Sequence, residues 1–148
     1  MAERALSAAG FGLGAVRERL RVLALGSLTG VVAGMGTFMF LQENFLPWGV
    51  TETWALGFVV AAGAYTHFLA ADLSESIALS LVAVVVGLAT NVVAWIGPLW
   101  ILGYPRFARG LLLPKMVGEA LASGLPTYLI TFYAAYFGAL TLGGYLEA

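Results

Sequence analysis

Residues 22–41 read VLALGSLTGVVAGMGTFMFL, and this stretch decides the fold because it contains no charged side chain. A membrane-spanning helix needs about 20 consecutive apolar residues to cross a hydrocarbon core roughly 30 Å thick. Arg17, Arg19 and Arg21 come immediately before it. A signal peptide also has a basic start, but this apolar run is too long and no Ala-x-Ala cleavage site follows it. We therefore predict a retained membrane-spanning helix over 22–41.

The composition of the whole chain agrees with a membrane location. Of its 148 residues, 61% are hydrophobic and only 10% are charged, whereas an ordinary soluble domain carries about 25% charged residues. So few charges cannot cover the surface of a soluble domain of this size. The net charge of −1 offers no basic excess for nucleic acid, so we expect no such partner. The lipid bilayer is the expected partner of an all-α integral membrane protein.

Three further apolar stretches predict three further crossings, at 54–71, 77–103 and 125–146. The short polar turn 72–76 makes the second and third spans antiparallel neighbours, and Asp72 is placed to cap the third one. The third span is long enough to tilt or to kink at Pro98. These crossings together predict one transmembrane domain over 22–148, a bundle of about four helices.

Two segments do not fit a simple span. Residues 111–123 contain Pro114, Lys115 and Glu119, so we expect an interfacial or re-entrant helix there. Residues 1–21 carry apolar side chains at heptad spacing: Leu6, Ala9, Leu13, Val16 and Leu20. We predict a short amphipathic helix at the membrane surface, interrupted near the glycines at 10, 12 and 14. A frayed terminus is the alternative.

The orientation follows from the basic residues. The arginine cluster before the first span favours a cytoplasmic N-terminus. The opposite side holds nearly as many basic residues, so insertion in both orientations, or a re-entrant 104–123 segment, stays open. The Ala-, Gly-, Val- and Leu-rich composition resembles that of small prokaryotic membrane proteins, and we expect a prokaryotic cell membrane.

Small residues recur along one face of the first and third spans. Gly26, Gly30 and Gly34 are four residues apart and share a helix face. Ala83 and Gly87 form a similar face in the third span. Such glycine-zipper patterns let helix backbones approach closely in lipid. They predict helix–helix packing within the chain, in a homo-oligomer or in a larger complex.

Few polar residues lie inside the predicted spans, and each has a structural and a functional interpretation. Asn91 and Thr90 are near the middle of the third span. Asn91 is expected to form an interhelical hydrogen bond, with solute or ion binding as the alternative. His67 is expected to bond locally near the interface, with a proton-responsive role as the alternative. Glu119 either pairs with Lys115 or couples to a cation inside the bilayer.

Three basic residues follow the third span: Arg106, Arg109 and Lys115. They are expected to contact lipid headgroup phosphates, with a substrate phosphate as the alternative. The chain has no cysteine and a single histidine, so we expect no metal site and no cofactor. No sequence motif of a known catalytic class occurs.

Three functions are compatible with these features. The favoured one is a non-catalytic membrane subunit that packs against itself or a larger complex. The second is a small oligomeric transporter or channel lined by His67, Thr90, Asn91 and Glu119. The third is an enzyme acting on lipid phosphates, which requires Arg106 and Arg109 to act together with Asp72 or Glu119.

Overall fold

A computed structural model describes residues 2–42, 46 and 48–147, with side chains described from residue 14 to residue 146 of these ranges. The described part is helical and contains no strand, which confirms the predicted all-α bundle. Its elements are α1 (Ala2–Leu41), α2 (Glu52–Phe68), α3 (Leu73–Ile96), α4 (Pro98–Ile101) and α5 (Arg106–Glu147).

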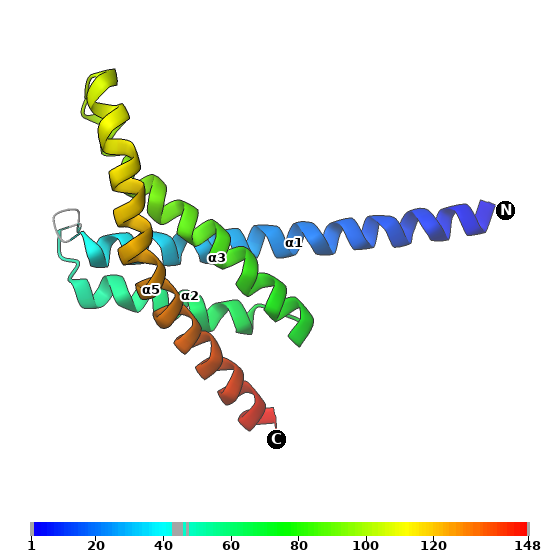
Figure 1. Cartoon of the computed structure of the whole chain (residues 1–148). Coiled ribbons are helices and arrows are strands. Elements are labelled where there is room, and N and C mark those ends of the chain that lie inside the picture. The colour runs from blue at the N-terminus through cyan, green and yellow to red at the C-terminus, as the bar shows by residue number, and fades with distance from the viewer. Residues whose placement is uncertain (1, 43–45, 47, 148) are drawn as a thin grey trace.

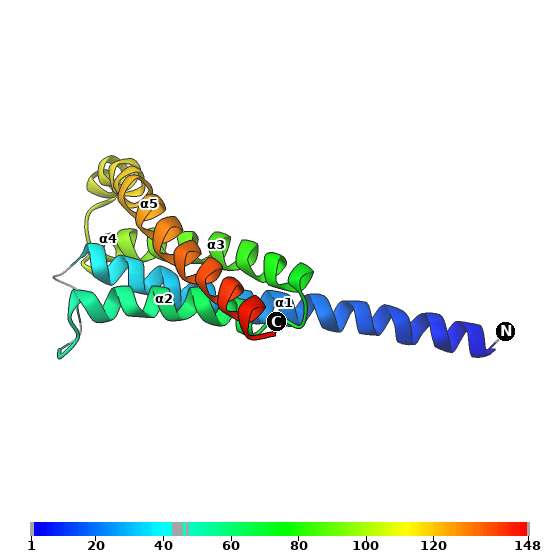
Figure 2. The same cartoon turned by 90° about the horizontal axis from the view of Figure 1, so that it is seen from below.

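The helices form a crossed arrangement around α1. α2 runs back beside α1, α3 crosses α1 closely, and α5 lies diagonally across α2 and α3 (Figure 1, Figure 2). The N-terminal part of α1 extends far beyond the other helices, and the first turns of α5 extend beyond the bundle at the other end (Figure 1).

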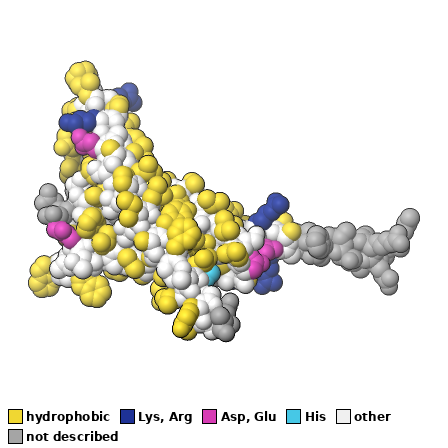
Figure 3. Space-filling view, turned by 60° about the horizontal axis from the view of Figure 1, so that its bottom comes forward, with side chains coloured by type: hydrophobic (Ala, Val, Ile, Leu, Met, Phe, Trp, Pro, Cys, Tyr) yellow, Lys and Arg dark blue, Asp and Glu magenta, His cyan; other side chains and the backbone are white. Residues whose placement is uncertain are grey.

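Three segments in the described residues are long and apolar enough to cross a membrane: Gly14–Leu41, Leu73–Ile101 and Arg106–Leu146. They indicate a membrane-embedded protein. Figure 3 agrees, because hydrophobic side chains cover most of the face shown and charged ones gather mainly near two ends. α2 has 17 residues, about 25 Å of helix, so a fourth crossing stays a prediction.

The structure changes several predicted boundaries. The third span is divided at Gly97 into α3 and the short α4, which begins at Pro98. The predicted 111–123 segment and 125–146 span are one continuous helix, α5, with Pro114 and Pro126 inside it. Proline removes one backbone donor, and membrane helices tolerate this where neighbouring groups satisfy the freed carbonyl.

The predicted interruption of the N-terminal helix is wrong. α1 runs unbroken through the glycines at 10, 12 and 14 and continues into the predicted first span. Glycine lowers helix propensity by about 1 kcal/mol but leaves helical backbone geometry fully accessible. The segment 1–21 therefore continues into the predicted first span as one helix, and its place at the membrane surface stays a prediction.

The core lies where α1, α2, α3 and α5 meet, and small residues make room in it for two aromatic rings. Its buried members are Ala33, Val59, Ala62, Ala83, Tyr128 and Phe132. The rings of Tyr128 and Phe132 stack with centroids 5.3 Å apart. The Tyr128 hydroxyl donates a hydrogen bond of 2.6 Å to the Ala83 carbonyl, so the one polar atom of this tyrosine side chain is satisfied in the core.

Candidate functional site

The glycine face of α1 lies against α3 of the same chain. A Cβ atom placed on Gly30 would lie 2.7 Å from the Ala83 carbonyl oxygen, and one on Gly34 would meet the Gly87 carbonyl oxygen. A Cβ atom on Gly26 would lie 2.7 Å from the Val82 side chain. All three glycines therefore lie where another helix leaves no room for a side chain.

Gly87 is the point where three helices meet. Its backbone faces Gly30 and Gly34 of α1, and a Cβ atom on Gly87 would overlap the ring and hydroxyl of Tyr128 from α5. A hydrogen atom is thus the only side chain that fits between α1 and Tyr128. The sequence places Gly87 on the small-residue face of its span, but it does not predict the part played by Tyr128.

Asn91 lies further along α3 and is fully buried. Its Nδ2 donates to the Ala120 carbonyl of α5 at 3.3 Å, and a Cβ atom on Gly124 would overlap that same amide group. Its Oδ1 is buried without a hydrogen-bond partner among the described residues. Asn91 therefore joins α3 to α5 by a hydrogen bond between helices, which is the structural role expected from the sequence.

The other proposed transport residues make other contacts. The Thr90 hydroxyl donates to the Val86 carbonyl at 2.8 Å, within its own helix. Glu119 is exposed on α5, with an oxygen 4.0 Å from Lys115 Nζ. His67 lies near the end of α2. The structure does not bring these candidates, His67, Thr90, Asn91 and Glu119, around one cavity.

His67 belongs to a hydrogen-bonded chain at the end of the bundle. Its Nδ1 lies 3.0 Å from the Ser76 hydroxyl of α3, and that hydroxyl lies 2.8 Å from the Tyr136 hydroxyl of α5. The chain joins three helices. On its open side, His67 lines a pocket of about 640 Å³ together with Asp72, Gly143 and Gly144. A Cβ atom on Gly143 would lie 3.2 Å from His67 Nε2.

Arg21 connects three helices at the same end. Its Nη1 lies 3.3 Å from Glu75 Oε1 of α3, and its Nη2 donates to the Leu69 carbonyl at the end of α2 at 3.0 Å. The Glu75 side chain is only 5% exposed, so a nearby cation is needed to offset the loss of hydration. Asp72 caps α3 by accepting a 2.7 Å hydrogen bond from the Glu75 amide, as predicted.

The sequence assigns Arg21 only to the orientation of the chain in the membrane and does not predict its ion pair with Glu75. The available signal is the position of Arg21 at the border of the apolar run and of Glu75 in the first turn of the next predicted helix. These two positions begin the first and third spans, which run in the same direction, so both lie at the same end of the bundle. Their side-chain contact depends on helix rotation, which the sequence does not specify.

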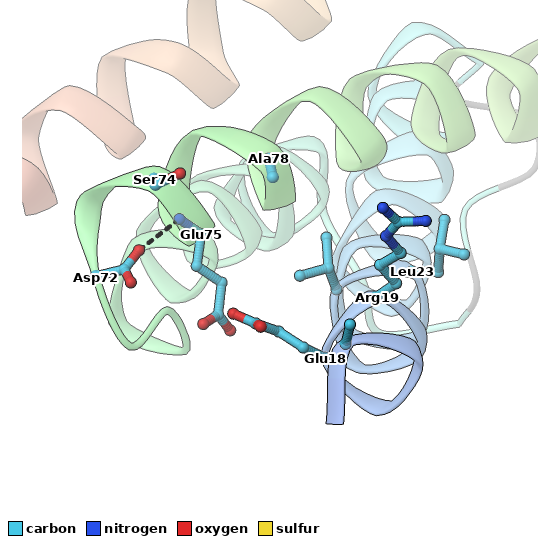
Figure 4. Close-up of a pocket in the computed structure, with 9 residues that line it drawn as sticks. Glu18, Arg19, Leu23, Asp72, Ser74, Glu75 and Ala78 are labelled. Carbon is cyan, nitrogen blue, oxygen red and sulfur yellow. Dashed lines mark hydrogen bonds between the residues drawn. The ribbon is translucent and has the colours of Figure 1, made fainter. Parts of the chain in front are cut away.

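An open pocket of about 600 Å³ lies between α1 and the start of α3. In Figure 4, Glu18 of α1 and Glu75 of α3 turn their carboxylates toward one another across it, with Arg19 and Leu23 on the α1 side. Among the described residues, no group of three His, Cys, Asp or Glu side chains is placed to hold a metal ion. The pocket brings charged side chains of α1 close to those at the start of α3.

The remaining basic residues lie at the other end of α3. Arg106 begins α5 and is exposed, and Lys115 is exposed two to three turns later. The Arg109 guanidinium lies 6.0 Å from the centre of the Trp100 ring, at the edge of cation–π range. Their contact with lipid phosphates stays a prediction.

Comparison with known proteins gives no further guide, because no family model, no curated protein and no solved structure is similar to this chain.

Proposed function

We propose that this multi-pass membrane protein is a non-catalytic helical subunit, acting through helix contacts in a homo-oligomer or in a larger membrane complex. We place it in a prokaryotic cell membrane, with the N-terminus in the cytoplasm. Three apolar helices of membrane-spanning length support the membrane location. The choice of a subunit over a transporter or an enzyme rests on how the polar side chains are used.

One observation carries the proposal: the buried threonine, serine and asparagine side chains of the bundle form hydrogen bonds between or within its own helices. Thr29, Thr37 and Thr66 each bond to a carbonyl one turn back on the same helix. Asn91 bonds across to α5. A solute path needs polar groups that converge on a shared opening, and these groups lie at separate helix contacts.

The geometry also argues against the third function, an enzyme that acts on lipid phosphates. Asp72 caps the start of α3, while Arg106 and Arg109 follow its far end. The 24 residues of α3 are about 36 Å long. An acid or base at Asp72 is therefore out of reach of a phosphate held by these arginines.

The test is extraction of the tagged protein in mild detergent, with the mass of the intact complex measured directly. A discrete homo-oligomer or a stoichiometric partner is the expected result. Reconstituted vesicles should show no more H⁺, Na⁺ or K⁺ flux than protein-free vesicles. A monomer without a partner, or a saturable flux that requires the protein, would contradict the proposal.

A small oligomeric transporter is the second candidate, and one observation favours it. The chain His67–Ser76–Tyr136 begins at the 640 Å³ pocket and continues between α3 and α5. Linked hydroxyl and imidazole groups of this kind can relay protons. If this function is correct, H⁺ flux into vesicles is lost in Ser76→Ala and kept in Ser74→Ala, a change at an exposed serine two residues away.

A further inference from the structure

The N-terminal part of α1 carries a seam of apolar residues spaced alternately three and four apart: Leu6, Ala9, Leu13, Val16, Leu20 and Leu23. This is the a/d spacing of a coiled coil, in which one narrow face of a helix packs against another helix. An amphipathic helix lying in a membrane surface instead shows a broad apolar face.

The seam lies on a helix that projects away from the bundle. α1 has 40 residues, about 60 Å of helix, of which the predicted span 22–41 needs about 30 Å to cross the hydrocarbon core. Arg21, with its ion pair to Glu75, lies near the end of the packed bundle, and Ala15, Glu18 and Arg19 line the open pocket just beyond it. Residues 2–21 belong to the same helix and account for about 30 Å of its length. Figures 1 and 2 show the N-terminal part of α1 projecting from the other helices.

In the described part of the seam, Val16, Leu20 and Leu23 are more than half exposed, and Leu23 also lines the open pocket beside the start of α3. Every side chain from residue 14 to residue 21 is exposed, and Val16 and Leu20 are 54% and 61% exposed. Because this segment continues α1 without interruption and precedes the uncharged run 22–41, we expect it to leave the bilayer along the axis of that helix rather than lie on the membrane surface. Arg17, Glu18 and Arg19 lie off the seam and suit water.

We infer that residues 6–23 form a parallel coiled coil with the same segment of a second copy of this chain. Two copies inserted in the same orientation are related by an axis along the membrane normal, which places identical seams face to face and in register. In this register Arg17 faces Gly12 of the other copy, and Arg19 faces Ala24. No like charges therefore meet across the seam.

The helix also needs such a partner. Isolated helices of this length are marginal in water, and glycines at 10, 12 and 14 each lower helix propensity by about 1 kcal/mol. Burial of the leucines against a second copy offsets that loss. This inference rests on the proposed subunit function and names its partner and its contact surface.

The absence of native cysteine makes the test direct. Single cysteines are placed in the full-length chain at the seam, by Val16→Cys and Leu20→Cys, and off the seam, by Ala15→Cys and Glu18→Cys. The membranes are oxidised and the covalent dimer is quantified. Facing seam positions in a coiled coil lie within disulfide range, so the seam variants should form several-fold more dimer than the off-seam variants.

Other outcomes separate this inference from the function on which it rests. Equal dimer yields at positions 16 and 18, or no dimer in variants present at the wild-type level, would overturn the coiled coil. Co-purification of a different membrane protein without any cross-link would overturn the second copy and keep the subunit function. A monomer that shows neither a cross-link nor a co-purifying protein would overturn both the coiled coil and the subunit function. The seam cysteines can also be tested with a water-soluble maleimide. If they form no dimer and do not react with it, lipid covers the seam, and the coiled coil is overturned.

Discussion

Gly30 illustrates how closely α1 and α3 approach at the scale of single atoms. A methyl group there would lie 2.7 Å from a carbonyl oxygen of α3, and a backbone oxygen has no rotamer by which to withdraw. Overpacking of this kind costs about 1–3 kcal/mol. Gly30→Ala should therefore lower the apparent unfolding temperature in detergent, as measured by the loss of monodisperse protein on heating.

Gly57 in α2 is the matched control for Gly30. A Cβ atom at this helical glycine would meet nothing within 4 Å, so Gly57→Ala should leave thermal stability unchanged or raise it. Equal losses in the two variants would mean that the contact between α1 and α3 is looser than the structure shows.

Asn91 permits a test of what its buried amide contributes. Its single hydrogen bond to α5 is worth less than about 1 kcal/mol in a membrane protein, and leucine would also remove the unpartnered Oδ1. Asn91→Leu should therefore stay folded with a small change in thermal stability. Asn91→Asp should be severely destabilised, because an ionised carboxylate there lacks a cation. A stable Asn91→Asp variant would show that water reaches this position.

At the residue scale, much of the packing is predictable from the sequence. The spacing of Gly26, Gly30 and Gly34 indicates a close helix contact, and α3 lies on that face. The sequence cannot identify which helix fills the face, because Ala- and Gly-rich surfaces of several helices fit equally well. The fit of Tyr128 against Gly87 is unpredictable for a related reason, since it depends on the crossing of α5 over α3.

Arg21 acts at the scale of elements, because it connects α1 to the ends of α2 and α3. Removing it leaves the buried Glu75 carboxylate without its ion-pair partner, which is costlier than losing both partners. Arg21→Met should therefore reduce thermal stability more than the double variant Arg21→Met/Glu75→Gln. The expected coupling is about 0.5–3 kcal/mol, measured as a double-mutant cycle of unfolding in detergent.

Arg17 provides the comparison, since it lies one helical turn earlier and its side chain is exposed. Arg17→Met should have little effect on unfolding. If the Arg17 and Arg21 variants behave alike, the loss arises from general charge near the membrane surface and the specific pair with Glu75 contributes nothing.

Element boundaries are predictable only in part. Capping by Asp72 is predicted correctly because it follows from local chemistry. Of the two alternatives for the third span, a tilt or a kink at Pro98, the end of α3 just before Pro98 agrees with the second. The length of α5 is not predicted correctly, because prolines at 114 and 126 favour helix ends, whereas the helix continues through both. Likewise, the glycines in α1 favour an interruption that does not occur. In both helices, residues that weaken a helix in isolation are outweighed by the rest of a long helical segment.

The number of crossings is a question for the whole molecule, and thiol labelling can answer it. Single cysteines introduced by Ser74→Cys, in the first turn of α3, and by Trp48→Cys, at an exposed position before α2, lie at opposite ends of α2. If α2 crosses the membrane, an impermeant maleimide added to intact cells should label only one of the two variants. Labelling of both from the same side would show that α2 does not cross.

Gly87 has a mechanical consequence for the molecule as a whole. α1 presses on one side of it and the Tyr128 ring on the other, so neither helix can slide along α3 without pushing a backbone or a ring out of place. A shift of one residue is about 1.5 Å along a helix, which is more than this contact leaves free. A displacement transmitted down α1 from its projecting end would therefore be passed to the Tyr128 ring of α5 at this position.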